Sequence, residues 1–198
     1  MTLTQLHEHS PDRIHDERRE QIKRVALKIF AQRGIAGTKM SMIASEAGIS
    51  QGLSYRYFNS KEEIFSVLVQ EAIGEAQEAI KNVHQLPGTP LEQIRTLTKR
   101  MLDESHKHFF LLLQQVQKSD DVPVKAKEMI NHYSPKDTID LLIPIFIKGQ
   151  QTGEFCEGDP QELLFLYFTV ITGLMLQETQ SNKGWLLEVD TLMKILTK

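Results

Sequence analysis

The polar and basic side chains of residues 17–61 are the first candidates for chemistry, because together they could bind a polyanion. This stretch holds nine Lys and Arg residues against three Glu, a formal charge of +6. The whole 198-residue chain carries −3, so the remainder carries −9. Phosphates are bound by positive charge together with hydroxyl and amide donors. The asymmetry indicates either a basic module joined to an acidic body or two differently solvated faces.

Residues that could catalyse a reaction or bind a metal do not form a recognisable constellation. The sequence contains no Gly-x4-Gly-Lys-Ser/Thr, Gly-x-Gly-x-x-Gly, His-Glu-x-x-His or Cys-x-x-Cys motif. His106 and His108 are two positions apart, so on a helix they point to different sides and do not pair as metal ligands. The single cysteine, Cys156, is either a redox sensor or an inert thiol. We therefore expect no catalytic residue, cofactor or metal site, and no enzyme.

Three helices within residues 17–57 must position the polar side chains of the basic stretch, and the last two of these helices are very short. They are joined at residues 47–50, which is the arrangement of a helix-turn-helix. The motif needs a small residue where its helices cross, here Ala44, and a turn residue free to adopt positive φ, here Gly48. The apolar residues expected to face the first helix are Ile43, Ala47 and Ile49.

One position departs from the pattern of a helix-turn-helix. Six residues after the turn glycine an aliphatic side chain is usually buried, and this chain has Ser54 there with Leu53 beside it. The sequence therefore leaves open whether the second helix of the motif is rotated, and where Leu53 points.

These residues resemble the N-terminal domain of the tetracycline-repressor (TetR) family over residues 22–65. The matching positions, at the spacing of the family, are Phe30, Gly34, Thr38, Ile43, Ala44, residues 47–50, Gly52, residues 55–58 and residues 60–63. The second half resembles the family only in its helix order and in the loose pattern of residues 149–155. The resemblance implies a regulator of transcription that binds DNA as a homodimer.

The predicted DNA contacts follow from the helix-turn-helix. Gln51 begins its second helix, where the amide could pair with a base edge in the major groove, and Gly52 allows close approach of the backbone. Tyr55 and Tyr57 could each bind a phosphate or order the core, and Arg56 either reaches a phosphate or is solvated. The predicted set is Thr38, Lys39, Ser41, Gln51, Gly52, Leu53, Tyr55, Tyr57 and Lys61.

The pattern of apolar residues predicts an all-α chain of about nine helices, and no window alternates with the period of a strand. The expected helices cover residues 11–33, 42–47, 51–57, 60–83, 89–102, 109–116, 124–132, 135–146, 163–177 and 185–196. Capping boxes are expected at residues 60–63 and 89–92, and a kink at Pro144. We expect a flexible tail over residues 1–15, a DNA-binding domain over 16–65, and an effector-binding and dimerisation domain over 66–198.

Composition gives no sign of a membrane protein or of a secreted one. The first 24 residues lack the apolar stretch of a signal peptide, and the longest apolar run, residues 163–176, is too short and too polar to cross a bilayer. We expect a cytoplasmic protein that does not contact membranes.

The helix over residues 163–177 is apolar nearly all round, which favours a dimer interface. The alternative is a central helix buried inside one subunit. The predicted interface residues are Leu163, Leu166, Val170, Gly173, Leu174, Leu192 and Ile195.

Residues 91–153 are expected to enclose a pocket for a small-molecule effector. The same Met and Phe residues could instead be ordinary core. The predicted lining is Met101, His106, Phe109, Phe110, Leu113, Gln114, Tyr133, Phe146 and Phe168.

Together these features predict a repressor that binds a palindromic operator as a homodimer and is released by a small hydrophobic effector. Two alternatives stay open: a DNA-binding activator or architectural factor without an effector, and an all-α enzyme.

Overall fold

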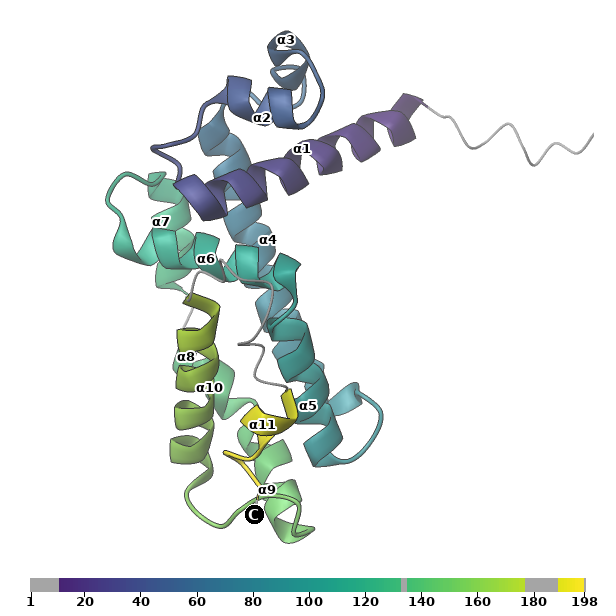
Figure 1. Ribbon diagram of the computed structural model, residues 1–198, viewed down its shortest axis with the longest axis vertical. Helices are drawn as coiled ribbons and strands as arrows, with labels where there is room; N and C mark the ends of the chain where they lie inside the picture. Colours follow the sequence, from purple (N-terminus) through teal and green to yellow (C-terminus); the bar gives the residue numbers. More distant parts are fainter. Residues whose placement is uncertain (1–10, 133–134, 177–188, 198) are drawn as a thin grey trace, which may run out of the picture.

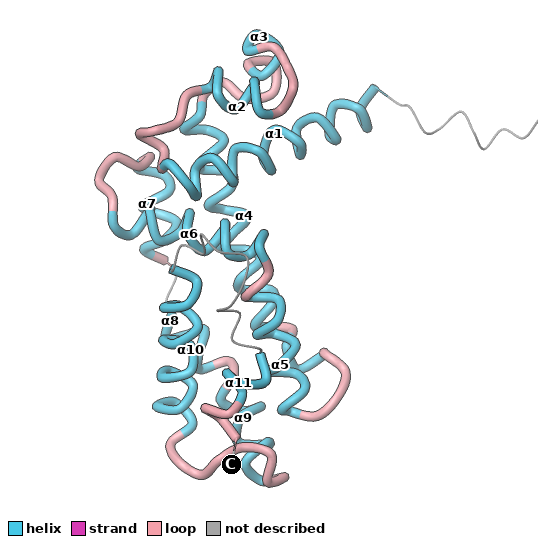
Figure 2. Tube along the Cα trace, in the orientation of Figure 1, coloured by secondary structure: helices cyan, strands magenta, loops and turns pink. Residues whose placement is uncertain are grey.

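The computed structural model describes residues 11–132, 135–176 and 189–197, and every regular element within these ranges is helical. The predicted all-α fold class is confirmed. The molecule is elongated, with α1, α2 and α3 at one end and α5, α9 and α11 toward the other (Figures 1 and 2).

The N-terminal end of the molecule, here called the head, comprises α1 (Pro11–Arg33), α2 (Met40–Glu46), α3 (Gln51–Ser54) and the first turns of α4 (Lys61–Lys81). Ile22, Ala26 and Phe30 form the fully buried stripe of α1, as their spacing predicts. Helix α1 begins at Pro11 and ends at Arg33, the bounds of the helix expected over residues 11–33. Proline is well suited to the first turn of a helix, since its φ is already fixed there.

The rest of the chain, here called the body, comprises the second half of α4 and the helices that follow it. Figure 1 shows α4 running out of the head to the far end of α5. The elements are η2 (Val83–Gln85), α5 (Pro90–Met101), α6 (Glu104–Lys118), α7 (Val124–Asn131), α8 (Pro135–Asp140), α9 (Ile143–Gln151), α10 (Pro160–Leu176) and α11 (Val189–Met193).

Local hydrogen bonds explain where several helices begin. The hydroxyls of Ser50 and Ser60 accept from the backbone N–H three residues later, which caps α3 and α4. Thr89 and Glu92 form the complete capping box expected before α5. Asp159 caps α10 by accepting from two backbone N–H groups, those of Gln161 and Glu162.

The segment around Pro144 contains a break instead of the predicted kink. Helix α8 ends at Asp140, and α9 begins at Ile143 with Pro144 in its first turn. Proline has no N–H and would clash with the preceding turn of a continuous helix, so it is accommodated better at a new start. The buried side chain of Leu142 holds the junction in the core of the body.

Two hydrophobic cores stabilise the chain, and their boundary differs from the expected domain boundary at residue 65. The first core contains residues of α1, α2 and α4 but also Leu112 and Val116 of α6 and Ala126 and Ile130 of α7. The second core joins the end of α4 to α5, α8, α9, α10 and α11. The head therefore shares one core with two helices that the sequence assigns to the body.

The last predicted helix, over residues 185–196, begins outside the described residues, and the structure shows α11 over Val189–Met193. Among the described residues no helix combines the length and the apolar character needed to cross a lipid bilayer.

Candidate nucleic-acid interface

The turn between α2 and α3 has the geometry of a helix-turn-helix. Gly48 adopts φ +64°, the left-handed conformation that glycine tolerates without a steric penalty. The N–H of Ile49 donates to the carbonyl of Ala44 over 3.0 Å, which closes the turn. Ala44 and Ala47 are 1% and 3% exposed, so small side chains let the two helices approach each other.

Ser54 occupies the buried position of α3 and settles the orientation of this helix. Its side chain is fully buried, and its hydroxyl donates to the Gln51 carbonyl over 2.7 Å. Leu53 is half-buried beside it. The helix therefore keeps the usual orientation of the motif, and a serine replaces the aliphatic side chain because its hydroxyl finds an acceptor within the helix.

The opposite side of α3 is exposed and polar. Gln51, Gly52 and Tyr55 all face solvent, and Gln51 and Tyr55 share one side of the helix because they are four positions apart. Lys39 and Ser41, at the start of α2, are exposed as well. Figure 1 shows α2 and α3 at the tip of the molecule, away from the body. One end of the molecule thus exposes the amide of Gln51, the backbone of Gly52, the hydroxyls of Ser41 and Tyr55, and the ammonium of Lys39.

Thr38 does not belong to this surface. Its side chain is fully buried, and its hydroxyl donates to the Gly34 carbonyl over 2.6 Å. The DNA contact of Thr38 stays a prediction, while its hydroxyl holds the loop that precedes α2.

Lys61 forms hydrogen bonds within the protein that its sequence position did not indicate. Its ammonium donates to the carbonyls of Ile35 and Thr38 over 2.7 and 2.8 Å. Its side chain is 24% exposed, so part of it remains accessible. In this structure Lys61 ties the start of α4 to the loop that leads into α2.

Tyr57 lies at the junction of α3, α4 and α1. Its ring is half-buried and packs against the ring of His15 at 4.7 Å between centroids. Arg19 donates to the Tyr57 carbonyl over 2.9 Å, and its guanidinium lies 4.1 Å from the centroid of the Phe58 ring. Tyr57 therefore packs against the first core, and its binding of a phosphate stays a prediction.

A buried ammonium joins α1 to α4 behind this surface. Lys23 is 8% exposed, and its Nζ lies 2.7 Å from a Glu20 carboxylate oxygen and within hydrogen-bond distance of Glu71. Burial alone would lower the pKa of Lys23, but the hydrogen bonds to Glu20 and Glu71 outweigh it and raise the pKa above its ordinary value. Lys23 is therefore charged at neutral pH and fixes the angle between the two helices.

The residues predicted to line an effector pocket are divided between the two cores. Phe109 and Leu113 of α6 pack against the first core, whereas Met101, Phe110 and Phe168 pack against the second. Phe146 is fully buried and stacks on Phe155 with 4.6 Å between centroids, so it is ordinary core. His106 is 44% exposed, Gln114 is half-buried, and Tyr133 lies outside the described residues. The structure does not gather this set around one cavity.

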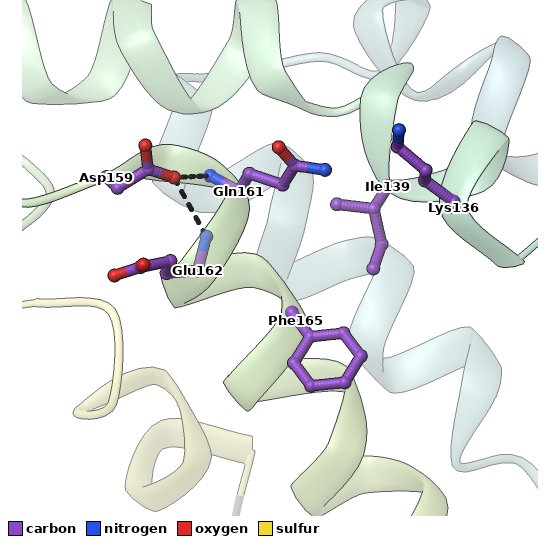
Figure 3. Close-up of a pocket in the computed structure, with 6 residues that line it drawn as sticks. All are labelled: Lys136, Ile139, Asp159, Gln161, Glu162 and Phe165. Atoms are coloured by element: carbon purple, nitrogen blue, oxygen red, sulfur yellow. Dashed lines mark hydrogen bonds between the residues drawn. The ribbon is translucent and has the colours of Figure 1, made fainter.

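Two hollows among the described residues lie elsewhere. One of about 490 Å³ opens between α8 and α10, where Phe165 lies below Ile139 and the capping carboxylate of Asp159 (Figure 3). A second, of about 390 Å³, lies between α6 and α7. Neither is lined by a residue from the predicted effector set. Their lining residues are Lys136, Ile139, Asp159, Gln161, Glu162 and Phe165 for the first, and Val116, Gln117, Lys127, Ile130 and Asn131 for the second.

Helix α10 buries one side in the body and leaves an apolar strip exposed. Phe165 and Leu166 are 64% and 52% exposed, and Gly173 and Leu176 continue the strip along the helix. Of the other residues predicted for the interface, Leu163, Val170, Leu174 and Ile195 are half-buried. Leu192 is only 2% exposed, so it belongs to the subunit core and offers almost no surface to a partner.

Residues 22–68 match the family described as bacterial regulatory proteins, tetR family. This segment contains the helix-turn-helix and the start of α4. The chain belongs to the TetR family.

Relatives of this TetR-family chain are regulators of transcription. It is 33% identical over 102 residues to the HTH-type transcriptional regulator YerO of Bacillus subtilis, an alignment that covers 50% of this chain and 35% of YerO. The chain thus matches about a third of that relative's length. It is 28% identical to the fatty acid metabolism regulator protein of the same organism, over 70% of this chain and 71% of that protein.

The fold of this TetR-family chain is similar to that of solved structures. The ketosteroid transcriptional regulator KstR2 of Mycobacterium tuberculosis superposes with a TM-score of 0.66 and 19% sequence identity, covering 91% of this chain and 95% of that one. At this identity the likeness shows a shared fold.

The sequence analysis did not identify the residues that hold α1 against its neighbours in the DNA-binding motif of this TetR-family chain. Arg19 and Lys23 contribute to the basic charge of residues 17–61, yet both are used inside the protein. The available signal was their position on α1: Lys23 directly follows the buried Ile22, where a charged side chain must find a partner.

Proposed function

We propose that this protein is a DNA-binding regulator of transcription that reads the major groove with α3. The observation that carries the proposal is the exposed face of Gln51, Gly52 and Tyr55 on a helix whose opposite side is held by buried Ser54. Gln51 would pair with a base edge, while Tyr55, Lys39 and Ser41 would bind phosphates on either side of the groove. A regulator of this kind acts where the DNA is, in the cytoplasm.

We further propose a homodimer formed through α10. Its exposed strip begins at Phe165 and Leu166 and recurs every three or four positions after Leu166, at Thr169, Gly173 and Leu176. The same strip of a second subunit would cover it. A symmetric dimer would place two α3 helices about one turn of DNA apart, roughly 34–36 Å. The operator would then be palindromic.

The regulator is proposed to be a repressor released by a small hydrophobic effector. Two similar proteins carry names that point to lipid-like compounds, the fatty acid metabolism regulator and the ketosteroid regulator. Helix α4 supports the idea physically, since it begins beside the DNA-binding surface and ends in the second core. An effector that prefers one arrangement of the body would bias the head through this helix.

A second candidate is a DNA-binding activator or architectural factor that needs no effector. The division of the predicted pocket residues between two cores favours it. A thermal-shift screen against acyl compounds, sterols and lipophilic drugs separates the two: a saturable rise in the melting temperature supports the repressor, and no response across the panel supports the second candidate. An all-α enzyme is the least favoured function, because the sequence shows no catalytic constellation.

The proposed function is tested by selecting duplexes from a random-sequence library with the purified protein. We expect enrichment of a palindrome, which is then labelled for fluorescence anisotropy. Gln51→Ala should weaken binding of the selected duplex by about tenfold, because one bidentate base contact is worth about 1–3 kcal/mol. Its affinity for a scrambled duplex should not change.

The matched control is Gln151→Ala, at an exposed glutamine of α9. It should bind the selected duplex as the wild type does. Equal loss of affinity for selected and scrambled duplexes in Gln51→Ala would show that Gln51 does not read bases, and no enrichment at all would contradict DNA recognition.

A further inference from the structure

Beside the apolar contacts of the first core, α6 makes a polar contact with the end of α1 through the side chain of Gln115. Its amide nitrogen donates to the carbonyl of Phe30 over 2.6 Å and to that of Ala31 over 3.4 Å. Both carbonyls belong to the last turn of α1, just before Gly34 turns the chain at φ +69° into the loop that leads to α2. A residue of the body thus holds the point at which α1 gives way to the DNA-binding motif.

This contact is poorly explained by stability. The Phe30 carbonyl already accepts from the Gly34 N–H over 2.9 Å, so the end of α1 does not need Gln115. The carbonyl oxygen of the Gln115 side chain is buried without a hydrogen-bond partner. An unpaired buried acceptor typically costs as much as one hydrogen bond contributes, about 1–3 kcal/mol. The stabilisation from the hydrogen bonds of the amide nitrogen is therefore offset by the cost of the unpaired amide oxygen.

The loop that follows is held from a second direction. Residues 34–39 connect α1 to α2 and end at the exposed Lys39. On the α4 side, Lys61 donates to the carbonyls of Ile35 and Thr38 within the same loop. On the α6 side, the amide of Gln115 donates to the carbonyls of Phe30 and Ala31, just before this loop. The position of Lys39 and Ser41 therefore depends on where both α4 and α6 lie.

We infer that Gln115 is a positioning residue for DNA binding, through which α6 sets the end of α1 and the placement of the loop that presents Lys39 and Ser41. This inference rests on the proposed function. It adds a polar connection between body and head to the two that already exist, the continuous helix α4 and the shared first core. A rearrangement of the body that withdraws Gln115 would loosen the loop while leaving α3 folded.

The test compares Gln115→Met with Gln117→Met in the full-length protein. Methionine keeps the length and volume of the side chain but removes the donor and the unpaired acceptor. We expect Gln115→Met to melt within about 3 °C of the wild type and to bind the selected duplex about five- to tenfold more weakly. Amide hydrogen exchange over residues 34–39 should become faster. Gln117 is an exposed glutamine on the same helix, and Gln117→Met should change none of the three measurements.

Each outcome decides the matter. Wild-type affinity in Gln115→Met overturns the inference while leaving the proposed function intact. A large drop in melting temperature that parallels the loss of affinity also overturns it, because the contact would then be structural. If the wild type itself enriches no duplex, the proposed function is wrong and this inference falls with it.

Discussion

At the scale of single residues, exposure and hydrogen-bond partners separate side chains that the sequence treats alike. Lys39 and Lys61 both appear in the basic stretch at the edge of the motif. Lys39 is exposed, whereas the ammonium of Lys61 is shared between two backbone carbonyls. A phosphate contact requires an ammonium with free donors in solvent, so Lys39 fits that role better and Lys61 acts mainly within the protein.

Lys61→Met should therefore behave as a destabilising change. Hydrogen bonds to charged groups contribute about 1.5–3 kcal/mol, and the partial exposure of this one puts the expected loss at about 1–2 kcal/mol. Thermal unfolding measures this loss. A salt titration of DNA binding should show a slope close to that of the wild type, because few phosphate contacts are lost.

Lys39→Met is the matched comparison. It should leave the unfolding free energy unchanged and reduce the slope of log K against log salt by about one, as expected for one lost phosphate contact. The reverse pattern, a smaller slope for Lys61→Met and an unchanged slope for Lys39→Met, would assign the phosphate contact to Lys61.

At the scale of elements, the head depends on how α1 is fixed to its neighbours. Lys23 connects α1 to α4 through Glu71, Arg19 connects it to the residues after α3, and Gln115 connects it to α6. These contacts surround a helix whose buried stripe supplies the apolar part of the same core. The angle of α1 is set by several polar contacts, each made to a different helix or segment.

Lys23→Met should lower the free energy of unfolding by about 1–2 kcal/mol at pH 7, since it leaves Glu20 and Glu71 without their cation while both remain partly exposed. The pKa of Lys23 is raised in the folded protein. Its contribution is therefore complete below the pKa of the unfolded chain, near 10.5, and is lost as pH rises through the higher folded pKa.

Urea unfolding at pH 7 and above pH 11 measures this contribution. The difference between wild type and Lys23→Met should shrink at the higher pH. Lys28→Met, at an exposed position one helix turn along α1, should show no difference at either pH. A Lys23→Met difference that is the same at both pH values would mean that the charge of Lys23 does not stabilise the fold.

At the scale of the whole molecule, the apolar strip of α10 is the largest feature that the isolated subunit leaves unexplained. Its buried residues, among them Leu164, Tyr167 and Ile171, already complete the body. The hydroxyl of Tyr167 is hydrogen-bonded to that of Thr98 at 2.7 Å, so the polar group on the inner side of α10 has its partner within the subunit. The exposed side is therefore where the proposed dimer would form.

Phe165→Glu should convert a dimer into a monomer in analytical ultracentrifugation at micromolar concentration, because two charges would be buried together without partners. Binding of the selected palindrome should weaken by well over tenfold, while binding of a half-site should stay the same. Val124→Glu serves as the control: Val124 is 72% exposed on α7, away from α10, and the variant should remain dimeric. A wild type that sediments as a monomer would contradict the proposed dimer.

The sequence determined those features of this protein that depend on neighbouring residues. Apolar spacing predicts α1 and α10, the capping box at residues 89–92 is confirmed, and Gly48 marks the turn of the helix-turn-helix. Each is fixed by hydrogen bonds or periodicity within a few positions, so it can be recognised before any packing is known.

Only the tertiary structure decided which side chains are accessible and which partners they have. Thr38 proved buried, Lys61 bonded to a loop 23 to 26 positions earlier, and Gln115 bonded to a carbonyl 85 positions away. The predicted pocket residues separated because α6 packs one side into each core. Such contacts depend on which helices meet across the fold, and the spacing of residues along one helix does not contain that information.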